Sequence, residues 1–216
     1  MNGVDAVWRV GRLTLGPLTT VFARRRVYGR ENVPPTGGVV LALNHFHWLD
    51  PAAFGAACPR TIYYMAKIEA HRVPGLGQVI RAFGTFSVRR GESDREAVRM
   101  MRRIVAEGKA LGLFVEGTRQ RSGVPGDVKP GAAMVAVQED VAVVPAAVSG
   151  TQRWRLGNFQ PAFVAWGQPM TFEDLPKNGK GYREASHEIE RRIRVLFDFL
   201  EDVQALGRPL VAVPPR

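Results

Sequence analysis

Apolar residues along the chain follow two patterns. Short continuous runs predict strands, because a strand that is covered on both faces of a sheet needs no polar alternation. The runs are residues 38–43, 61–65, 85–88, 110–115, 141–148 and 162–166. Between them, apolar residues recur at spacings of three and four, which is typical of helices with one buried face.

Two of these helices are clearly marked. In the first, Ser93-x-x-Glu96 forms a capping box, an apolar face follows, and Gly108 ends the helix. The last helix begins near Tyr182 and places Ile189, Ile193, Leu196, Leu200 and Val203 on one face. Alternating strands and helices predict a single-domain α/β fold with a mixed, largely parallel sheet flanked by helices.

The N-terminal segment suits a membrane surface better than a membrane interior. Its apolar run over residues 4–22 is interrupted by Arg9 and Arg12, and we expect Gly16-Pro17 to break it. A signal peptide is not indicated, because Asp5 stands where a basic region would be. Two interpretations stay open: an amphipathic segment that docks on a membrane, and a first helix packed on its own domain.

Composition describes an ordinary folded protein with a basic surface. The 216 residues are 45% hydrophobic and 23% charged, which excludes a disordered chain, and a single cysteine excludes an internal disulfide. The 30 Lys and Arg residues exceed the 20 Asp and Glu residues by 10. A phosphate-bearing partner is expected, which leaves anionic lipid, nucleic acid and small phosphorylated substrates as classes.

The first chemically informative cluster, residues 44–51, follows a predicted strand. Pro51 suits the first turn of a helix, so Asp50 is the expected N-cap and His45 lies in the preceding loop. If the chain bends between them, the carboxylate fixes the imidazole tautomer and leaves the other nitrogen free as a general base. Alternatively, Asp50 is only a helix cap, and His45 and His47 are ordinary polar loop residues.

Three further clusters lie at strand ends. Glu116, Gly117, Thr118 and Arg119 combine a carboxylate, a flexible backbone, a hydroxyl and a guanidinium, a set that suits a phosphate and polyol site or, more simply, a solvated turn. Residues 84–91 deliver two adjacent arginines that must point to opposite faces of a strand, so at most one enters a given pocket. Residues 143–150 read as a buried structural strand.

In this order, the motifs Asn-His-x4-Asp, Gly-x-x-x-Val-x-Arg, Phe-Val-Glu-Gly-Thr-Arg and Val-Pro-Ala-Ala-Val-Ser-Gly resemble the four blocks of the glycerolipid acyltransferases. The similarity is closest to the 1-acylglycerol-3-phosphate acyltransferases and spans about residues 35–151. Residues 66–69 also match the segment between the first two blocks.

This resemblance implies a glycerol-3-phosphate acyltransferase-like fold and a role for each matching residue. His45 matches the catalytic base and Asp50 its partner. The positions assigned to the acceptor's glycerol phosphate are Arg90, Glu116, Gly117, Thr118 and Arg119, and Lys67 adds charge there. The resemblance implies no metal, no cofactor and no acyl-enzyme. It also implies that the co-substrate is a thioester of coenzyme A or acyl carrier protein.

The implied reaction converts 1-acylglycerol-3-phosphate into phosphatidic acid. Two departures leave another lysolipid or a glycolipid acceptor open: Val115 stands where the family commonly has proline, and Ser87 where it often has an aromatic residue or proline. We expect residues 1–30 to dock on an anionic membrane, residues 31–208 to form the acyltransferase domain and residues 209–216 to be a Pro-rich tail. The enzyme would then be peripheral on the cytoplasmic face of the cell membrane.

Two rival classes fit less well. A basic nucleic-acid-binding module agrees with the charge, but the sequence has no recognised nucleic-acid-binding motif, so no nucleic acid partner is expected. A metal hydrolase would need a ligand set, and His45, His47 and Asp50 have no second cluster to complete one.

Overall fold

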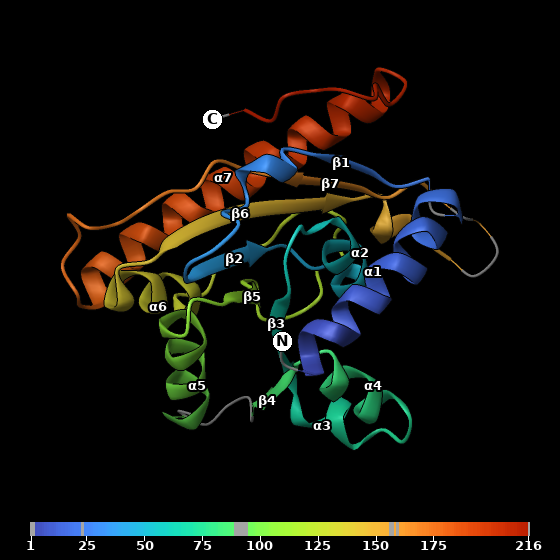
Figure 1. The fold of residues 1–216 in the computed structure, drawn as a ribbon. Helices are drawn as coiled ribbons and strands as arrows, with labels where there is room; N and C mark the ends of the chain where they lie inside the picture. The colour runs from blue at the N-terminus through green and yellow to red at the C-terminus, as the bar shows by residue number, and fades with distance from the viewer. Residues whose placement is uncertain (1–2, 23, 89–94, 156–157, 159, 216) are drawn as a thin grey trace.

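The central sheet is built from the continuous apolar runs and is covered by helices on both faces (Figure 1). The computed structural model describes residues 3–22, 24–88, 95–155, 158 and 160–215. Its strands are β1 (Arg26–Tyr28), β2 (Val39–Leu43), β3 (Ile62–Lys67), β4 (Phe86–Val88), β5 (Ala110–Phe114), β6 (Ala142–Ser149) and β7 (Phe163–Trp166). Its helices are α1 (Gly3–Phe22), α2 (Asp50–Ala57), α3 (Ile68–Arg72), α4 (Leu76–Ala82), α5 (Arg95–Ala106), α6 (Gly131–Glu139) and α7 (Gly179–Ala205), with short 3-10 turns at Arg30–Asn32 and Thr151–Arg153.

The strand order is β1-β7-β6-β2-β5-β3-β4, and every adjacent pair is parallel except β6 and β7. This confirms the predicted mixed, largely parallel sheet in a single α/β domain. Strand β2 lies between β5 and β6, so the carboxyl ends of these three parallel strands share one edge of the sheet. In open α/β sheets, ligand sites form at that edge.

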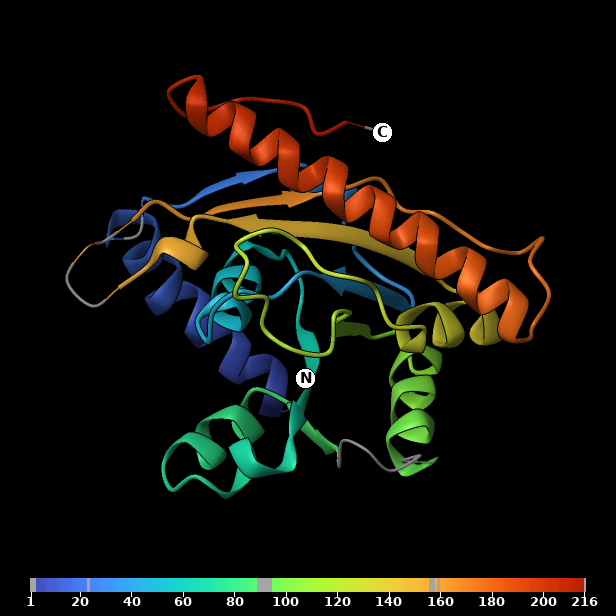
Figure 2. The same ribbon diagram turned by 180° about the vertical axis from the view of Figure 1, so that it is seen from behind.

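Side chains of β2 alternate between two hydrophobic layers, as the pleat of a strand requires. Val39, Leu41 and Leu43 pack in the layer that contains α1 and α2, whereas Val40 and Ala42 face α5 and α6. Helix α7 runs along the sheet and contributes to both layers, as Figure 2 shows from behind. The buried core therefore holds the end of β2 from both sides.

All six predicted strands are present, one strand is added, and the last helix begins earlier than predicted. Strand β1, which was not predicted, pairs with β7 at the edge of the sheet. Helix α7 begins at Gly179, because the Asn178 side chain accepts hydrogen bonds from Lys180 N and Gly181 N as an N-cap. Helix α5 is described from Arg95, so the predicted capping box at Ser93 lies outside the described residues.

Gly16-Pro17 interrupts the apolar run but does not end the helix, because α1 continues through Pro17 to Phe22. Proline removes one hydrogen bond of the helix ladder, and Pro17 is exposed, so the carbonyl that loses this bond can meet water. The Thr20 hydroxyl donates to the Gly16 carbonyl at 2.9 Å and adds a local contact at the same turn.

One face of α1 is anchored to the domain. Trp8 is buried and donates from Nε1 to the Phe83 carbonyl at 2.9 Å. A Cβ atom at Gly55 on α2 would lie 2.5 Å from the Trp8 ring, so the glycine allows this close approach. Val10 and Leu13 on another face are 60% and 71% exposed. The packing interpretation is thus confirmed for one face, and membrane contact of the other stays a prediction.

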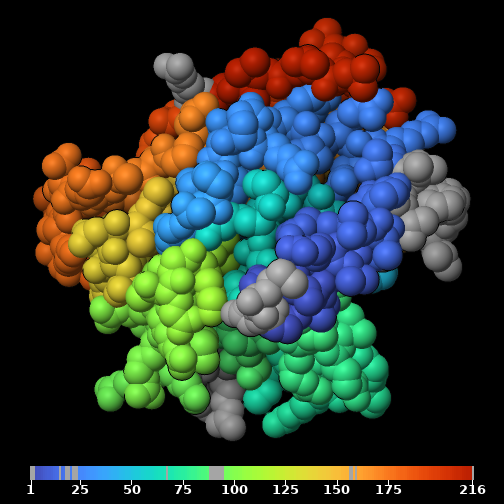
Figure 3. All heavy atoms as spheres, viewed as in Figure 1, coloured from blue at the N-terminus to red at the C-terminus, as the bar shows by residue number. Residues whose placement is uncertain are grey.

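Helix α1 lies at the molecular surface beside α3 and α4 (Figure 3). Across the described residues, no helix combines the length and apolar character needed to cross a bilayer.

The Pro-rich tail packs against β1 instead of extending away. The Tyr28 hydroxyl donates to the Pro209 carbonyl at 2.7 Å, and Pro214 is buried beside Gly29. Gly29 has a positive φ of 67°, and a Cβ there would lie 2.3 Å from the Trp166 carbonyl oxygen, so this turn requires glycine. The tail therefore covers the edge of the sheet that β1 forms (Figure 1).

Candidate active site

The loop after β2 is tied to the strand beside it. Asn44 is completely buried, and its side chain bonds to both backbone groups of Val148 on β6: Oδ1 accepts from Val148 N at 2.8 Å, and Nδ2 donates to Val148 O at 3.1 Å. This pair of bonds fixes the point at which the chain leaves the sheet and turns towards His45. The sequence motif contains Asn44, but its spacing gave no indication of this anchoring role.

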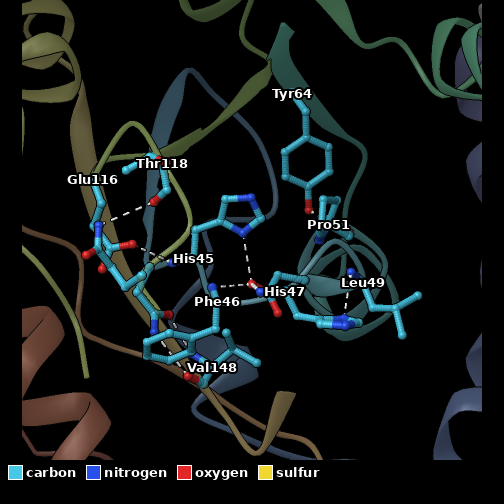
Figure 4. Close-up of polar contacts among 12 residues, drawn as sticks. His45, Phe46, His47, Leu49, Pro51, Tyr64, Glu116, Thr118 and Val148 are labelled. Carbon is cyan, nitrogen blue, oxygen red and sulfur yellow. Dashed lines mark hydrogen bonds and ion pairs between the residues drawn. The ribbon is translucent and has the colours of Figure 1, made fainter. Parts of the chain in front are cut away.

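His45 and Asp50 meet as the sequence predicts. Figure 4 shows His45 with Phe46, His47 and Glu116 around it. His45 Nδ1 lies 2.9 Å from Asp50 Oδ2, and the same oxygen accepts from the Phe46 and His47 backbone amides at 2.6 and 2.7 Å. The Asp50 carboxylate is fully buried. One oxygen thus gathers three donors, which bends the loop back towards the start of α2.

The predicted N-cap role of Asp50 needs a correction. Helix α2 begins at Asp50 itself, Leu49 occupies the N-cap position, and no side chain caps the helix. The Asp50 carboxylate bonds to amides that precede the helix instead of amides in its first turn. Because a negative charge in the first turn of a helix is also favoured by the helix dipole, this position still suits a carboxylate.

The His45 ring is held in one orientation by aromatic packing. It stacks on Phe114 at the end of β5 with a centroid separation of 4.1 Å, and Phe114 in turn stacks on Tyr64 at 5.8 Å. The His45 side chain is 16% exposed. Since Nδ1 is engaged by Asp50, Nε2 is the nitrogen that can reach a substrate.

Glu116 braces the loop between β5 and α6 and joins it to the loop that carries His45. It is only 3% exposed, and its Oε2 accepts from His45 N at 2.8 Å while Oε1 accepts from Gly126 N at 2.9 Å. Burial raises the pKa of this carboxyl group to about 7, although the two amide donors act in the opposite direction. Its carboxylate is thus committed to backbone groups, and contact with an acceptor remains a prediction.

The next residues continue along the same loop. Gly117 adopts a φ of 73°, a region that favours glycine. Thr118 and Arg119 are exposed, and the loop closes when Gln120 N donates to the His45 carbonyl at 2.7 Å. The structure therefore brings the segment 116–119 together with His45 and Asp50.

A second imidazole, that of His47, lies near Trp154 and Arg155, two residues that the sequence motifs did not indicate. Its ring centroid lies 5.8 Å from that of Trp154. The pKa of His47 is lowered, first by burial and also by the nearby Arg119 and Arg155 guanidinium groups, while Asp50 opposes the shift. Trp154 and Arg155 come shortly after the fourth motif, beyond the 3-10 turn at Thr151–Arg153, but only the path of that loop shows that they return to His47.

The side chains of two predicted site residues, Lys67 and Arg90, lie outside the described part of the structure. Lys67 is the last residue of β3, which is separated from β2 by β5, and its side chain is outside the described part of the structure. Arg90 also lies outside the described residues. Strand β4, which precedes Arg90, is the edge strand beyond β3.

An apolar cavity of about 290 Å³ lies between α1, α2 and α4. Tyr64 is one of its walls, and because Phe114 stacks on both Tyr64 and His45, the cavity neighbours the catalytic candidates. Its other main lining residues are aromatic or aliphatic: Trp8, Trp48, Leu49, Leu76, Val79 and Phe83. Trp48 is 65% exposed and lies on the same loop as His45.

Within the described ranges, no group of three or more His, Cys, Asp or Glu side chains is arranged to hold a metal ion. His45 and Asp50, two of the residues considered for that role, are bonded to each other. What the arrangement offers is an oriented imidazole next to a basic loop and an apolar cavity. These are the elements needed to deprotonate a hydroxyl group close to an anionic and a hydrophobic ligand.

Comparison with known proteins agrees with this chemistry. The sequence profile of the family described as Acyltransferase matches residues 24–149. The chain is 32% identical over 186 residues to the 1-acyl-sn-glycerol-3-phosphate acyltransferase of Bacillus subtilis, covering 82% of this chain and 90% of that protein. It is 30% identical over 140 residues to the enzyme of the same name from Borreliella burgdorferi, covering 61% of this chain and 54% of that protein.

The fold is also similar to a solved structure. The crystal structure of PlsC, the 1-acyl-sn-glycerophosphate acyltransferase from Thermotoga maritima, superposes with a TM-score of 0.63 at 22% identity, covering 90% of this chain and 81% of that one. The family profile covers more than half of the chain and includes His45, Asp50 and Glu116. The chain therefore belongs to the acyltransferase family and is an O-acyltransferase.

Proposed function

We propose that this enzyme transfers a fatty acyl group from a thioester to the free hydroxyl of 1-acylglycerol-3-phosphate, forming phosphatidic acid. The observation that carries the proposal is the His45–Asp50 contact at 2.9 Å, next to the loop that presents Arg119. The names of relatives that match most of the chain support the same acceptor. The donor would be a thioester of coenzyme A or acyl carrier protein.

In the proposed reaction, Nε2 of His45 takes the proton of the acceptor hydroxyl as its oxygen attacks the thioester carbonyl carbon. A carbon–oxygen bond forms, the carbon–sulfur bond breaks, and the departing thiolate takes the proton from the imidazolium. General-base assistance of this kind contributes roughly 10²- to 10⁴-fold to the rate. No protein nucleophile is required, because the acceptor oxygen itself attacks.

Asp50 has an orienting and electrostatic role in this scheme. Its contact with Nδ1 places the proton of neutral His45 on that nitrogen, which leaves Nε2 unprotonated and able to accept. When the ring becomes positive, the adjacent carboxylate compensates the charge. Asp50 stays buried, so water does not weaken this interaction.

The acceptor phosphate would be bound by the basic loop. Arg119 provides a bidentate donor and Thr118 a hydroxyl on the exposed part of the loop after β5. By resemblance to the family, Arg90 and Lys67 would add positive charge to this site. Glu116 would act indirectly, because it holds the loop that carries Thr118 and Arg119 against the loop that carries His45.

The apolar cavity beside Tyr64 would receive the fatty acyl chain of the donor. Its lining is almost entirely hydrophobic, and an acyl chain gains about 0.8 kcal/mol for each methylene that it removes from water. Trp48 lies on the loop between His45 and Asp50, where the cavity approaches the catalytic imidazole.

A peripheral position on the cytoplasmic face of the cell membrane fits these substrates. The exposed Val10 and Leu13 side chains on α1 would enter the headgroup region, and Arg24 on the following segment would contact anionic lipid.

The direct test of function uses the purified chain and a panel of acceptors. With radiolabelled acyl-coenzyme A or acyl carrier protein, we expect phosphatidic acid as the main product from 1-acylglycerol-3-phosphate, identified by mass spectrometry. Phosphate-free acceptors such as monoacylglycerol should react much more slowly, because the basic loop has no phosphate to bind. Preferential acylation of a phosphate-free lysolipid or glycolipid would reject the proposed acceptor.

Replacement of the base tests the mechanism. His45→Asn should lower kcat by roughly 10²- to 10⁴-fold, because it removes proton transfer in the transition state. The matched variant His47→Asn, two residues away on the same loop, should lose much less. Circular dichroism must show native folding in both, and near-normal turnover of His45→Asn would contradict the assignment.

The buried carboxyl of Glu116 gives a pH prediction. Folding raises its pKa from 4.5 to about 7, so the native state binds more protons than the unfolded state between these values. This group therefore lowers the free energy of unfolding as pH rises from about 4.5 to 7, by at most about 1 kcal/mol per pH unit. Glu116→Gln should remove that contribution in denaturant titrations, whereas Glu184→Gln on exposed α7 should retain it.

Glu116→Gln should also lower kcat. The glutamine oxygen can accept from only one of His45 N and Gly126 N, because the amide nitrogen that replaces the second oxygen is a donor. Identical pH–stability curves for this variant and the unaltered chain would show that Glu116 does not titrate in this range.

The cavity wall tests the site of the acyl chain. Ala56→Leu would place extra volume inside the cavity, and we expect activity to fall more for long-chain than for short-chain thioesters. Ala106→Leu makes the same chemical change at an exposed position on α5 and should leave chain-length preference unaltered. A uniform loss for all chain lengths with Ala56→Leu would place the donor chain elsewhere.

A further inference from the structure

A second hollow, of about 360 Å³, lies at the opposite edge of the sheet from His45. Its walls come from α1 and from the segments that lead into β3 and β5, where these parallel strands begin. Four of its lining residues are cationic: Arg9, Arg12, Arg60 and Lys109. The single acidic residue in the lining is Asp5, whose Oδ1 accepts from the Thr61 hydroxyl at 2.9 Å. Lys109 is paired with Glu107, so three further cations face one carboxylate in the lining, and the excess of positive charge comes from the arginines.

The geometry of two arginines shows that this charge is held in place. The Arg60 guanidinium donates to the carbonyls of Pro34, Gly37 and Gly108 at 2.8 to 2.9 Å, so its position is rigid and its charge is not neutralised. Arg12 lies with its guanidinium carbon 5.9 Å from the centre of the Trp8 ring. Its Nη1 is shielded from solvent and has no hydrogen-bond partner in the described structure.

A shielded guanidinium nitrogen without an acceptor is unfavourable, because buried polar groups are normally paired. Burial lowers the pKa of Arg12, and nearby Arg30 and Arg9 act in the same direction, whereas Cys58 and Asp5 oppose the shift. An anion in the hollow would compensate this positive charge and reduce the repulsion between the arginines. A phosphate group suits arginine best, since it offers several oxygens for bidentate bonding.

The surroundings of the hollow indicate the source of that phosphate. On α1, Val10 and Leu13 each follow one of the two lining arginines directly, and both side chains are more than half exposed. A lipid whose phosphate contacts Arg9 and Arg12 would have its acyl chains alongside these apolar residues. A free phosphate ion would use the hollow but not the apolar side chains.

We propose that this cationic hollow binds the headgroup phosphate of an anionic phospholipid at the membrane surface. The site is separate from the proposed acceptor site, because it lies where β3 and β5 begin and the catalytic pair lies at their far end. It would orient the enzyme on the bilayer through α1. Its test reads membrane binding, so the outcome does not depend on the reaction proposed above.

The experiment measures sedimentation of the full chain with vesicles of phosphatidylcholine, with and without phosphatidylglycerol. The test variant is Arg9→Gln with Arg12→Gln. The control is Arg99→Gln with Arg183→Gln, which removes the same charge from exposed positions on α5 and α7. Because each cation near an anionic surface contributes appreciably, the test variant should bind phosphatidylglycerol vesicles at least about tenfold more weakly, and the control less than about twofold.

Folding is checked by thermal unfolding, and Arg9→Gln alone provides a second test variant, because Arg9 is exposed. It should weaken vesicle binding in the same direction by a smaller factor. Equal losses in the test and control variants would show that only diffuse charge attracts the protein and would overturn the site. Equal binding to vesicles with and without phosphatidylglycerol would overturn it as well.

Inorganic phosphate distinguishes the two sources of the anion. We expect phosphate alone to raise the unfolding temperature of the unaltered chain less than phosphatidylglycerol vesicles do. If phosphate alone stabilised the unaltered chain but not the test variant, while vesicle binding stayed equal for all variants, the hollow would be a free-phosphate site and the lipid assignment would be rejected.

Discussion

The site depends on a buried carboxylate whose charge must be satisfied. Burying the Asp50 carboxylate in the core without any partner would reduce the free energy of unfolding by several kcal/mol. That cost is offset by the contact with His45 Nδ1, by two backbone amides and by the N-terminal end of α2. All three donors come from consecutive residues, so they can reach one oxygen only if the chain reverses sharply after β2. The requirement for satisfying one charge thus creates the bend that orients the imidazole.

The bend is rigid because the neighbouring strands hold it on both sides. On the β6 side, Asn44 bonds to both backbone groups of Val148, and on the β5 side, Glu116 accepts from the amide of His45. The stacking of His45 on Phe114 adds a third restraint. Catalytic groups gain most when their geometry is set before substrate arrives. The central place of β2 in the sheet makes this possible, since an edge strand has only one neighbour.

The amino-acid sequence predicted those features that depend on local patterns. Continuous apolar runs predicted the buried strands, and the proline after Asp50 predicted a strand-loop-helix junction that brings this residue to His45. It did not predict β1, because three residues at a sheet edge carry no distinct periodicity. The hydrogen bonds of Glu116 could not be predicted either, because they go to backbone amides whose positions depend on the path of two loops. The same holds for Arg155, which approaches His47 through folding and not through spacing.

The N-terminal segment completes its contacts late in the synthesis of the chain. Arg26 pairs with Phe163, Tyr28 bonds to Pro209, and Trp8 bonds to the carbonyl of Phe83. During translation, α1 and β1 therefore leave the ribosome long before any of these partners exists. Pairing between segments so distant in sequence is slow, and β1 can join the sheet only after β7 has been synthesised. Truncations that remove only the final residues would consequently act on the start of the chain, by leaving its first strand without the cover that seals the sheet.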